Sequence, residues 1–118
     1  MKWSLIVAVC ALCALPATAA ALSKTTVTIN NYNFGNDKFY GSIKSSKVEC
    51  KDDRRVIMYR RVPGPDVKVG ANRSKHGPGN SYFWTVKEES PTVADPYYAK
   101  VKKTGTCAAD RSDDFIFP

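Results

Sequence analysis

The segment Ser81-Tyr-Phe-Trp-Thr-Val-Lys87 decides the fold of this 118-residue chain. It is rich in aromatic and β-branched residues, which favour strands. Tyr82, Trp84 and Val86 recur at every second position, and a period of two places them together on one face of a strand. The segment therefore predicts a β-strand whose one face is turned to a core.

Five more segments of the chain show similar strand chemistry between turn signals. They are Thr25–Ile29, Phe39–Lys44, Arg55–Arg61, Asp66–Gly70 and Tyr97–Lys102. Pro63-Gly64 has the residues of a type II turn, so residues 55–70 predict a hairpin.

The Gly- and Pro-rich stretches 76–80 and 90–96 predict loops. After residue 20 no segment shows the apolar spacing of a helix. About seven short strands predict an all-β fold, an antiparallel Greek-key β-sandwich, with a small barrel as the alternative. The predicted core is Ile43, Val56, Met58, Tyr82, Trp84, Val86, Tyr97, Ala99 and Val101.

The first 20 residues resemble a secretory signal peptide. Lys2 is followed by an uncharged apolar run, a proline and then small residues, so cleavage is expected near Ala19, Ala20 or Ala21. One alternative is a membrane anchor, but the run of about 11 apolar residues is shorter than the ~20 of a spanning helix. The other alternative is a lipid-modified cysteine at Cys10 or Cys13. The predicted organisation is a signal at 1–20, a strand and turn-rich lead-in at 21–36, and a sandwich body at 37–118.

Removal of the signal would leave Cys50 and Cys107 as the cysteines of the mature chain. Two cysteines in a small exported domain have one intramolecular pairing, and an oxidising compartment preserves it. Neither has a C-x-x-C partner or a neighbouring His to activate a thiolate. A structural disulfide is predicted, in a secreted protein.

The order of several motifs resembles exported bacterial domains of the transthyretin-like (prealbumin-like, carboxypeptidase regulatory-like) β-sandwich type. The resemblance covers roughly residues 37–107 and lies in Phe39–Ser46, Arg55–Arg60, Asp66–Gly70, Phe83–Val86 and Tyr97–Val101, with Cys50 and Cys107. It implies a seven-stranded, non-enzymatic module. The glycine expected just before the aromatic strand is displaced to Gly79, which leaves the register of 79–84 open.

Few residues suggest catalysis or metal binding. The single His76 excludes a centre built on several imidazoles, and it lies in a Gly/Pro turn with Ser74 and Ser81 as its nearest possible nucleophiles. Calcium would favour converging carboxylates. Asp52, Asp53, Asp110, Asp113 and Asp114 flank the two cysteines, but basic residues are interleaved and no calcium-loop motif is present. No enzyme activity, cofactor or metal is expected.

The positive charge is concentrated in one part of the chain. The chain has 18 Lys+Arg and 11 Asp+Glu, a net charge of +7, and residues 38–75 alone carry 11 basic and four acidic side chains. Such a patch could bind a polyanion, with Phe39, Tyr40 and Tyr59 available to stack on sugars or bases. The candidate polyanion-binding residues are Lys44, Lys47, Arg54, Arg55, Arg60 and Arg61.

The sequence as a whole predicts a secreted, disulfide-bonded β-sandwich of the transthyretin-like or immunoglobulin-like kind, serving as a non-catalytic structural or binding module outside the cytoplasm. The alternative function is a polyanion, carbohydrate or cell-wall binder that uses the basic face, and its partner would be an anionic cell-surface polymer or another secreted protein. A solvated basic face that only maintains solubility would need no ligand. A small hydrolase or inhibitor is a third class, without a supporting residue pattern, and no nucleic-acid signature is present.

Overall fold

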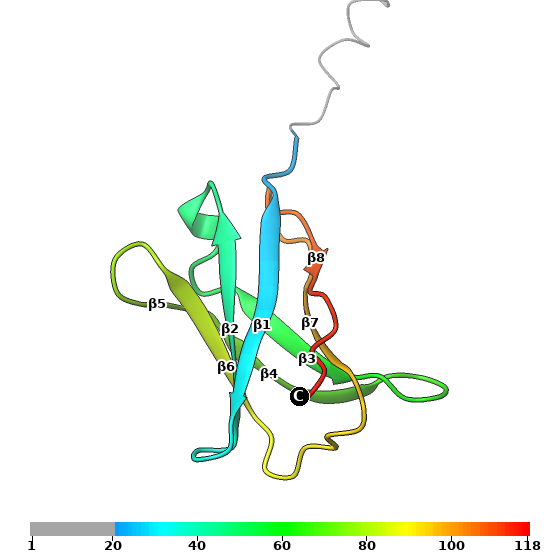
Figure 1. Ribbon diagram of the computed structural model, residues 1–118. Helices are drawn as coiled ribbons and strands as arrows, with labels where there is room; N and C mark the ends of the chain where they lie inside the picture. Colours follow the sequence, from blue (N-terminus) through cyan, green and yellow to red (C-terminus); the bar gives the residue numbers. More distant parts are fainter. Residues whose placement is uncertain (1–20) are drawn as a thin grey trace, which may run out of the picture.

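The computed structural model describes residues 21–118, which form two antiparallel sheets packed face to face (Figure 1). The first sheet has the spatial order β1 (Thr25–Asn33), β2 (Lys38–Ser45), β6 (Tyr82–Lys87) and β5 (Lys75–His76). The second sheet has the order β4 (Val67–Arg73), β3 (Arg55–Arg60), β7 (Tyr97–Val101) and β8 (Asp110–Arg111). The predicted Greek-key sandwich is confirmed, with eight strands. The predicted signal peptide lies outside the described residues.

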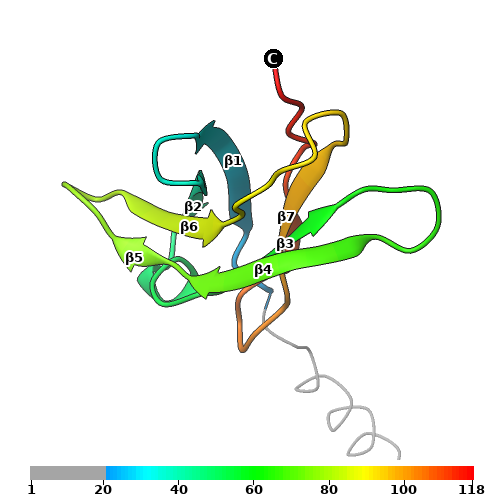
Figure 2. The same cartoon turned by 90° about the horizontal axis from the view of Figure 1, so that it is seen from below.

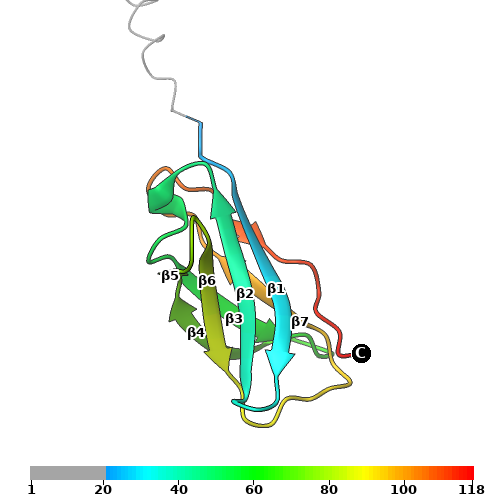
Figure 3. The ribbon, with the colours of Figure 1, turned by 60° about the vertical axis from the view of Figure 1, so that its left-hand side comes forward.

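The strand order is that of an immunoglobulin-type sandwich. Lettered along the chain, the first sheet reads A-B-E-D, and the second reads C-F-G with an additional strand C′ beside C. Seen from below, the strands form two layers, and the chain passes from one to the other between β4 and β5 (Figure 2). On the opposite side, the segment after β8 runs beside β7 (Figure 3), where Tyr97 and Phe115 form a bridge.

Ser74 fixes the passage from β4 to β5. It is buried, its hydroxyl donates to the Lys51 carbonyl at 2.6 Å, and the same oxygen accepts the Arg54 amide at 2.8 Å. Its own amide donates to the Arg54 carbonyl at 2.9 Å. A backbone that leaves one sheet has lost its ladder partners, and these bonds satisfy its polar groups instead.

β1 is longer than the sequence predicts. The asparagines after Ile29 favour a turn, but the strand continues to Asn33 and remains paired with β2. A register shift between Ile29 and Asn31 accommodates the change. Residue Asp37, at a φ of 59°, then makes the turn into β2. The predicted lead-in therefore contributes a strand to the sandwich.

Trp84 and Gly41 set the register that the sequence left open. They lie opposite each other between β6 and β2. A Cβ atom on Gly41 would lie 2.1 Å from the Thr28 carbonyl oxygen and 2.2 Å from Cζ2 of Trp84, so the indole occupies the space that any side chain here would need. Residues 77–81 form the turn between β5 and β6, in which the Gly77 amide donates to the Ser81 carbonyl at 2.9 Å.

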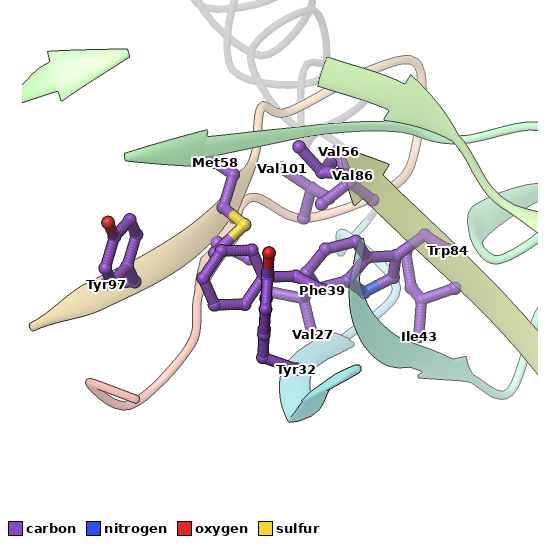
Figure 4. Close-up of a cluster of buried hydrophobic side chains, with 11 residues drawn as sticks. Val27, Tyr32, Phe39, Ile43, Val56, Met58, Trp84, Val86, Tyr97 and Val101 are labelled. Carbon is purple, nitrogen blue, oxygen red and sulfur yellow. The ribbon is translucent and has the colours of Figure 1, made fainter. Parts of the chain in front are cut away.

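The core lies between the two sheets and consists of large apolar side chains from both (Figure 4). Eight of the nine predicted core residues are buried; the ninth, Tyr82, is half-buried at the edge. Three further residues complete the buried cluster: Val27, Tyr32 and Phe39. Phe115 and Phe117 pack against it from the C-terminal segment, which has no alternating pattern to reveal them.

Candidate anion-binding site

The structure does not bring the six predicted polyanion-binding residues to one face. Lys44 is exposed near the end of β2 on the first sheet, and Lys47 is exposed in the loop that follows. Arg55 begins β3 on the second sheet and is exposed. The other three residues have different roles.

Arg60 and Arg61 lie at the far end of β3, where acidic partners hold them. Arg60 donates to Asp95 at 2.9 Å, and Arg61 is paired with Asp114. Because these pairs are half-exposed, each contributes only about 0–1 kcal/mol to stability. They nevertheless neutralise the charge that an incoming anion would meet.

Arg54 is not the freely exposed cation that the charge pattern predicts, because it is buried and its guanidinium is bonded to protein oxygens. Only 4% of the residue is exposed. One guanidinium nitrogen donates to Oγ1 of Thr25 at 3.0 Å and to the Cys50 carbonyl at 2.9 Å. The other donates to the carbonyls of Lys102 and Ala108, both at 2.8 Å. Arg54 therefore ties β1, the turn after β2 and the chain on both sides of Cys107 together.

Burial lowers the pKa of the Arg54 guanidinium from its usual value, although a guanidinium remains charged at any pH of interest. The guanidinium donates to four neutral oxygens, three of which are backbone carbonyls. A buried cation held this way adds positive potential to its surroundings, because its hydrogen-bond partners carry no charge.

The predicted disulfide between Cys50 and Cys107 is confirmed. The sulfurs are 1.99 Å apart and the Cα atoms 5.3 Å apart. Cys50 ends a short 3-10 helix, η2 (Val48–Cys50), and Cys107 lies in the turn that follows β7. By the chain-entropy relation, closing a loop of 57 positions stabilises the fold by about 4 kcal/mol. The bridge and Arg54 fix the same end of the sandwich.

Four cations surround a hollow at this end, which we call the basic hollow: Arg55, Arg73, Lys102 and Lys103. The hollow measures about 380 Å³, and Arg54, Ile57 and Thr104 also line it. Arg55 and Arg73 lie directly opposite each other across the β3–β4 ladder. Like charges at such positions repel each other and destabilise the sheet.

Acidic residues offset the basic hollow only in part. Glu49 and Asp53 are on its lining. Arg73 donates to the Asp53 carbonyl at 2.8 Å and lies 3.9 Å from its carboxylate, where both side chains are more than half exposed. Within residues 21–118, no carboxylate lies within 4.0 Å of Arg55, Lys102 or Lys103. The arrangement provides several unneutralised cations around one concave surface, which suits an anionic group.

Three residues of the basic hollow are not among those predicted from sequence: Arg73, Lys102 and Lys103. Arg73 belongs to the basic run 38–75, but nothing local shows that it faces Arg55. Lys102 and Lys103 lie outside that run. A lysine pair five residues before a predicted disulfide cysteine was the available signal, since the bridge brings that segment to Cys50.

The predicted stacking residues are also redistributed. Phe39 is fully buried. Tyr59 stacks on Tyr98 with ring centroids 5.3 Å apart, and Arg111 lies 3.7 Å above the Tyr98 ring. Burial, and then the 2.6 Å hydrogen bond to Asp66, raise the pKa of the Tyr98 phenol. Tyr40 is half-buried on the outward face of the first sheet, on the same side of β2 as Lys38 and Lys44.

His76 is exposed on β5 and is not joined to a nucleophile. Its ring stacks on Tyr82 at 4.8 Å, and Nε2 lies 2.7 Å from the Gly79 carbonyl oxygen. The Ser74 hydroxyl is bonded to Lys51, and that of Ser81 donates to the Pro78 carbonyl at 2.7 Å. Both candidate hydroxyls are therefore occupied by backbone carbonyls.

The carboxylates considered for calcium do not converge. Asp110 accepts the Val27 amide at 2.8 Å, and Asp114 is paired with Arg61 and Arg111. Asp53 lies with Arg73 in the basic hollow. Among residues 21–118, no three His, Cys, Asp or Glu side chains are placed to hold one metal ion. Nor does any helix in that range have the length and apolar character to cross a membrane.

The fold and the site together define a class: a β-sandwich with immunoglobulin-type strand order, one disulfide and a basic hollow beside it. No protein-family model matches the chain, and no curated protein is significantly similar to it. The resemblance to transthyretin-like domains therefore remains a prediction from sequence.

Proposed function

We propose that this chain is an exported, non-catalytic β-sandwich module that binds an anionic polymer through the basic hollow. The observation that carries the proposal is the direct opposition of Arg55 and Arg73, with Lys102 and Lys103 around the same 380 Å³ hollow. A stable fold gains nothing from repelling cations at one place. The negative groups of a bound polyanion would attract both arginines and so offset their mutual repulsion.

The basic hollow also has rigid support. Arg55 follows the buried Arg54, and Lys102 supplies one of the carbonyls that Arg54 binds. The disulfide holds the Cys107 turn, which leads back to Lys103, against η2. Cations on a fixed scaffold lose less conformational entropy on binding than cations on free loops. The disulfide additionally favours an oxidising compartment, in agreement with the predicted signal peptide.

Heparin affinity chromatography on a salt gradient tests the proposal. The variant Arg55→Ala/Arg73→Ala should bind at least about tenfold more weakly than the wild type, equivalent to about 1.4 kcal/mol. The control Lys24→Ala/Lys68→Ala removes the same charge from exposed positions outside the hollow. If both variants elute at the same salt concentration, binding follows net charge only and the proposed site is wrong.

A further inference from the structure

A second hollow with a different chemistry lies on the outward face of the first sheet. It measures about 260 Å³, and Trp84 is on its lining. We call it the aromatic hollow after two further rings, those of Tyr40 and Phe83, which line it together with Lys38, Lys75 and Thr85. The β-register explains why they meet. Tyr40 lies opposite Thr85, and Lys75 lies opposite Phe83 on the other side of the same strand.

The two rings are diagonal neighbours on β2 and β6, since Phe83 is two residues from the partner of Tyr40. Phe83 is 37% exposed although it is a large apolar side chain. A Cβ on Gly77 would lie only 3.1 Å from its ring, so the glycine lets the ring lie against the backbone. The Tyr40 phenol accepts a 2.5 Å hydrogen bond from the Asn36 amide. Both rings are thus held in place while part of their surface faces solvent.

The sheet that carries these rings has no acidic residue in any of its strands. β1, β2, β5 and β6 contain no Asp or Glu, whereas Lys38, Lys44, Lys75 and Lys87 lie on them. The strands therefore contribute only positive charge to this face. Of the four lysines, Lys87 forms an ion pair with Glu89, at 3.4 Å.

Arg73 connects the two hollows, because it lines both. It ends β4 just before the chain crosses to β5, so the basic hollow lies on one side of this crossing and the aromatic hollow on the other. A polymer bound in the basic hollow can continue past Arg73 to Lys75 and Phe83 without leaving positively charged surface.

We infer that the aromatic hollow is a second subsite for the same polymer and that the polymer is an acidic polysaccharide; the inference rests on the proposed function. Partly exposed rings stack on the apolar faces of sugars, and the Tyr40 and Thr85 hydroxyls can both donate to and accept from sugar hydroxyls. Lys38 and Lys75 attract the carboxylate or sulfate groups. A site with hydroxyls that donate and accept matches a polyol better than phosphates, which only accept.

The test compares heparin oligosaccharides of two lengths by isothermal titration calorimetry and by amide chemical shifts. Phe83→Leu removes the ring and retains an apolar side chain; Ile116→Ala, at an exposed apolar site elsewhere, is the control. We expect Phe83→Leu to weaken decasaccharide binding about tenfold, the scale of losing one stacked ring. Disaccharide binding should not change. In the wild type, the decasaccharide should shift the amides of Lys75 and Phe83, and the disaccharide only those around Arg55 and Arg73.

The outcomes separate this inference from the proposed function. If Arg55→Ala/Lys102→Ala, which alters only the basic hollow, weakens decasaccharide binding and Phe83→Leu does not, the second subsite is wrong while the basic hollow stands. If neither variant weakens decasaccharide binding, both the basic hollow and the second subsite are wrong. A ten-residue oligothymidylate is the competing probe. If it binds more tightly than the decasaccharide and depends on Phe83, the polymer is a single-stranded nucleic acid and the assignment to a polysaccharide is overturned.

Discussion

At one end of the sandwich polar links join the sheets, whereas at the other end aromatic rings close the core. The polar end contains the disulfide and the buried Arg54 with its four acceptors. At the aromatic end, Phe39 lies within 6 Å of four other rings, those of Tyr32, Tyr97, Phe115 and Phe117.

The difference explains where the candidate site lies. Burial of aromatic rings places no charge in the core, and the cations of the aromatic end pair with Asp95 and Asp114 at the surface. At the polar end the buried Arg54 guanidinium donates to uncharged oxygens, three of which are backbone carbonyls. Its surroundings remain positive, and the same rigidity that it provides positions Arg55 and Lys102.

The largest effect is expected from Phe39→Ala at the aromatic end. Removing a fully buried ring should cost about 3–5 kcal/mol of unfolding free energy, because the transfer energy is lost and a cavity remains. Urea unfolding followed by Trp84 fluorescence measures it. Phe34→Ala is the control, because Phe34 is 66% exposed, and it should cost less than about 1 kcal/mol. Equal costs would show that the aromatic end is not packed as described.

Arg54→Met should break the polar end, at a cost of about 3 kcal/mol. Methionine fills the aliphatic volume but leaves the carbonyls of Cys50, Lys102 and Ala108 without a donor. Arg54→Lys should recover only part of the loss, since one ammonium group cannot replace a planar fork.

The same variant tests whether the two ends are independent. When Arg54→Met is combined with Cys50→Ala/Cys107→Ala, the total loss of unfolding free energy should be less than the sum of the separate losses, because Arg54 and the disulfide fix the same turns. Combined with Phe39→Ala, the costs should add within about 0.5 kcal/mol. If the costs of Arg54→Met and of the cysteine substitutions add strictly, Arg54 and the disulfide stabilise the fold independently.

Alkaline pH should weaken the aromatic end through Tyr32. Burial, and then Asp37, raise the pKa of its phenol, which donates to the Glu88 carbonyl at 2.5 Å. The folded state therefore keeps this proton after the unfolded state begins to lose it near pH 10. The stabilisation is complete below that pH and is lost as pH rises through the folded pKa.

Tyr32→Phe should accordingly cost about 1 kcal/mol at pH 7 and show a shallower loss of stability above pH 10. Urea unfolding at pH 7, 9.5 and 10.5 provides the comparison. Part of the slope should persist because the pKa of Tyr98 is raised as well. An unchanged slope would mean that Tyr32 titrates alike in both states.

The smallest effect is expected from relieving the Arg55–Arg73 repulsion at the polar end. Arg55→Ala should leave stability unchanged or raise it by about 0.5 kcal/mol, because a directly opposed like charge is removed. Chemical unfolding at low salt should reveal the gain, and 0.5 M NaCl should reduce it. A clear loss of stability would give Arg55 a structural role and weaken the case for a ligand.

Local pattern predicted much of the fold and little of the site. Trp84, Val86, Ala99 and Val101 were identified as core because alternation is a property of consecutive residues. The hairpin of residues 55–70 follows from its turn in the same way, although β4 extends to Arg73. Phe117 was missed because an irregular C-terminal segment has no period to detect.

Arg54 illustrates why the basic residues were harder to place. In sequence it is one arginine beside another, yet Arg54, just before β3, is buried among partners from distant segments, and Arg55, the first residue of β3, is exposed. Whether a side chain is exposed to solvent depends on which segments pack against it in the folded protein. Charge counts over residues 38–75 could therefore locate positive potential but not assign it to a surface.

The sequence by itself determined the strands, the sandwich class, the bridge between Cys50 and Cys107 and most of the core, because alternation, turn chemistry and cysteine number are encoded locally. Only the tertiary structure decided that Arg54 is buried, that Arg60 and Arg61 are neutralised, and that Arg55 and Arg73 meet beside Lys102 and Lys103. Those facts depend on how two sheets pack and which loops the disulfide joins. Contacts between residues distant in the chain have no local signal.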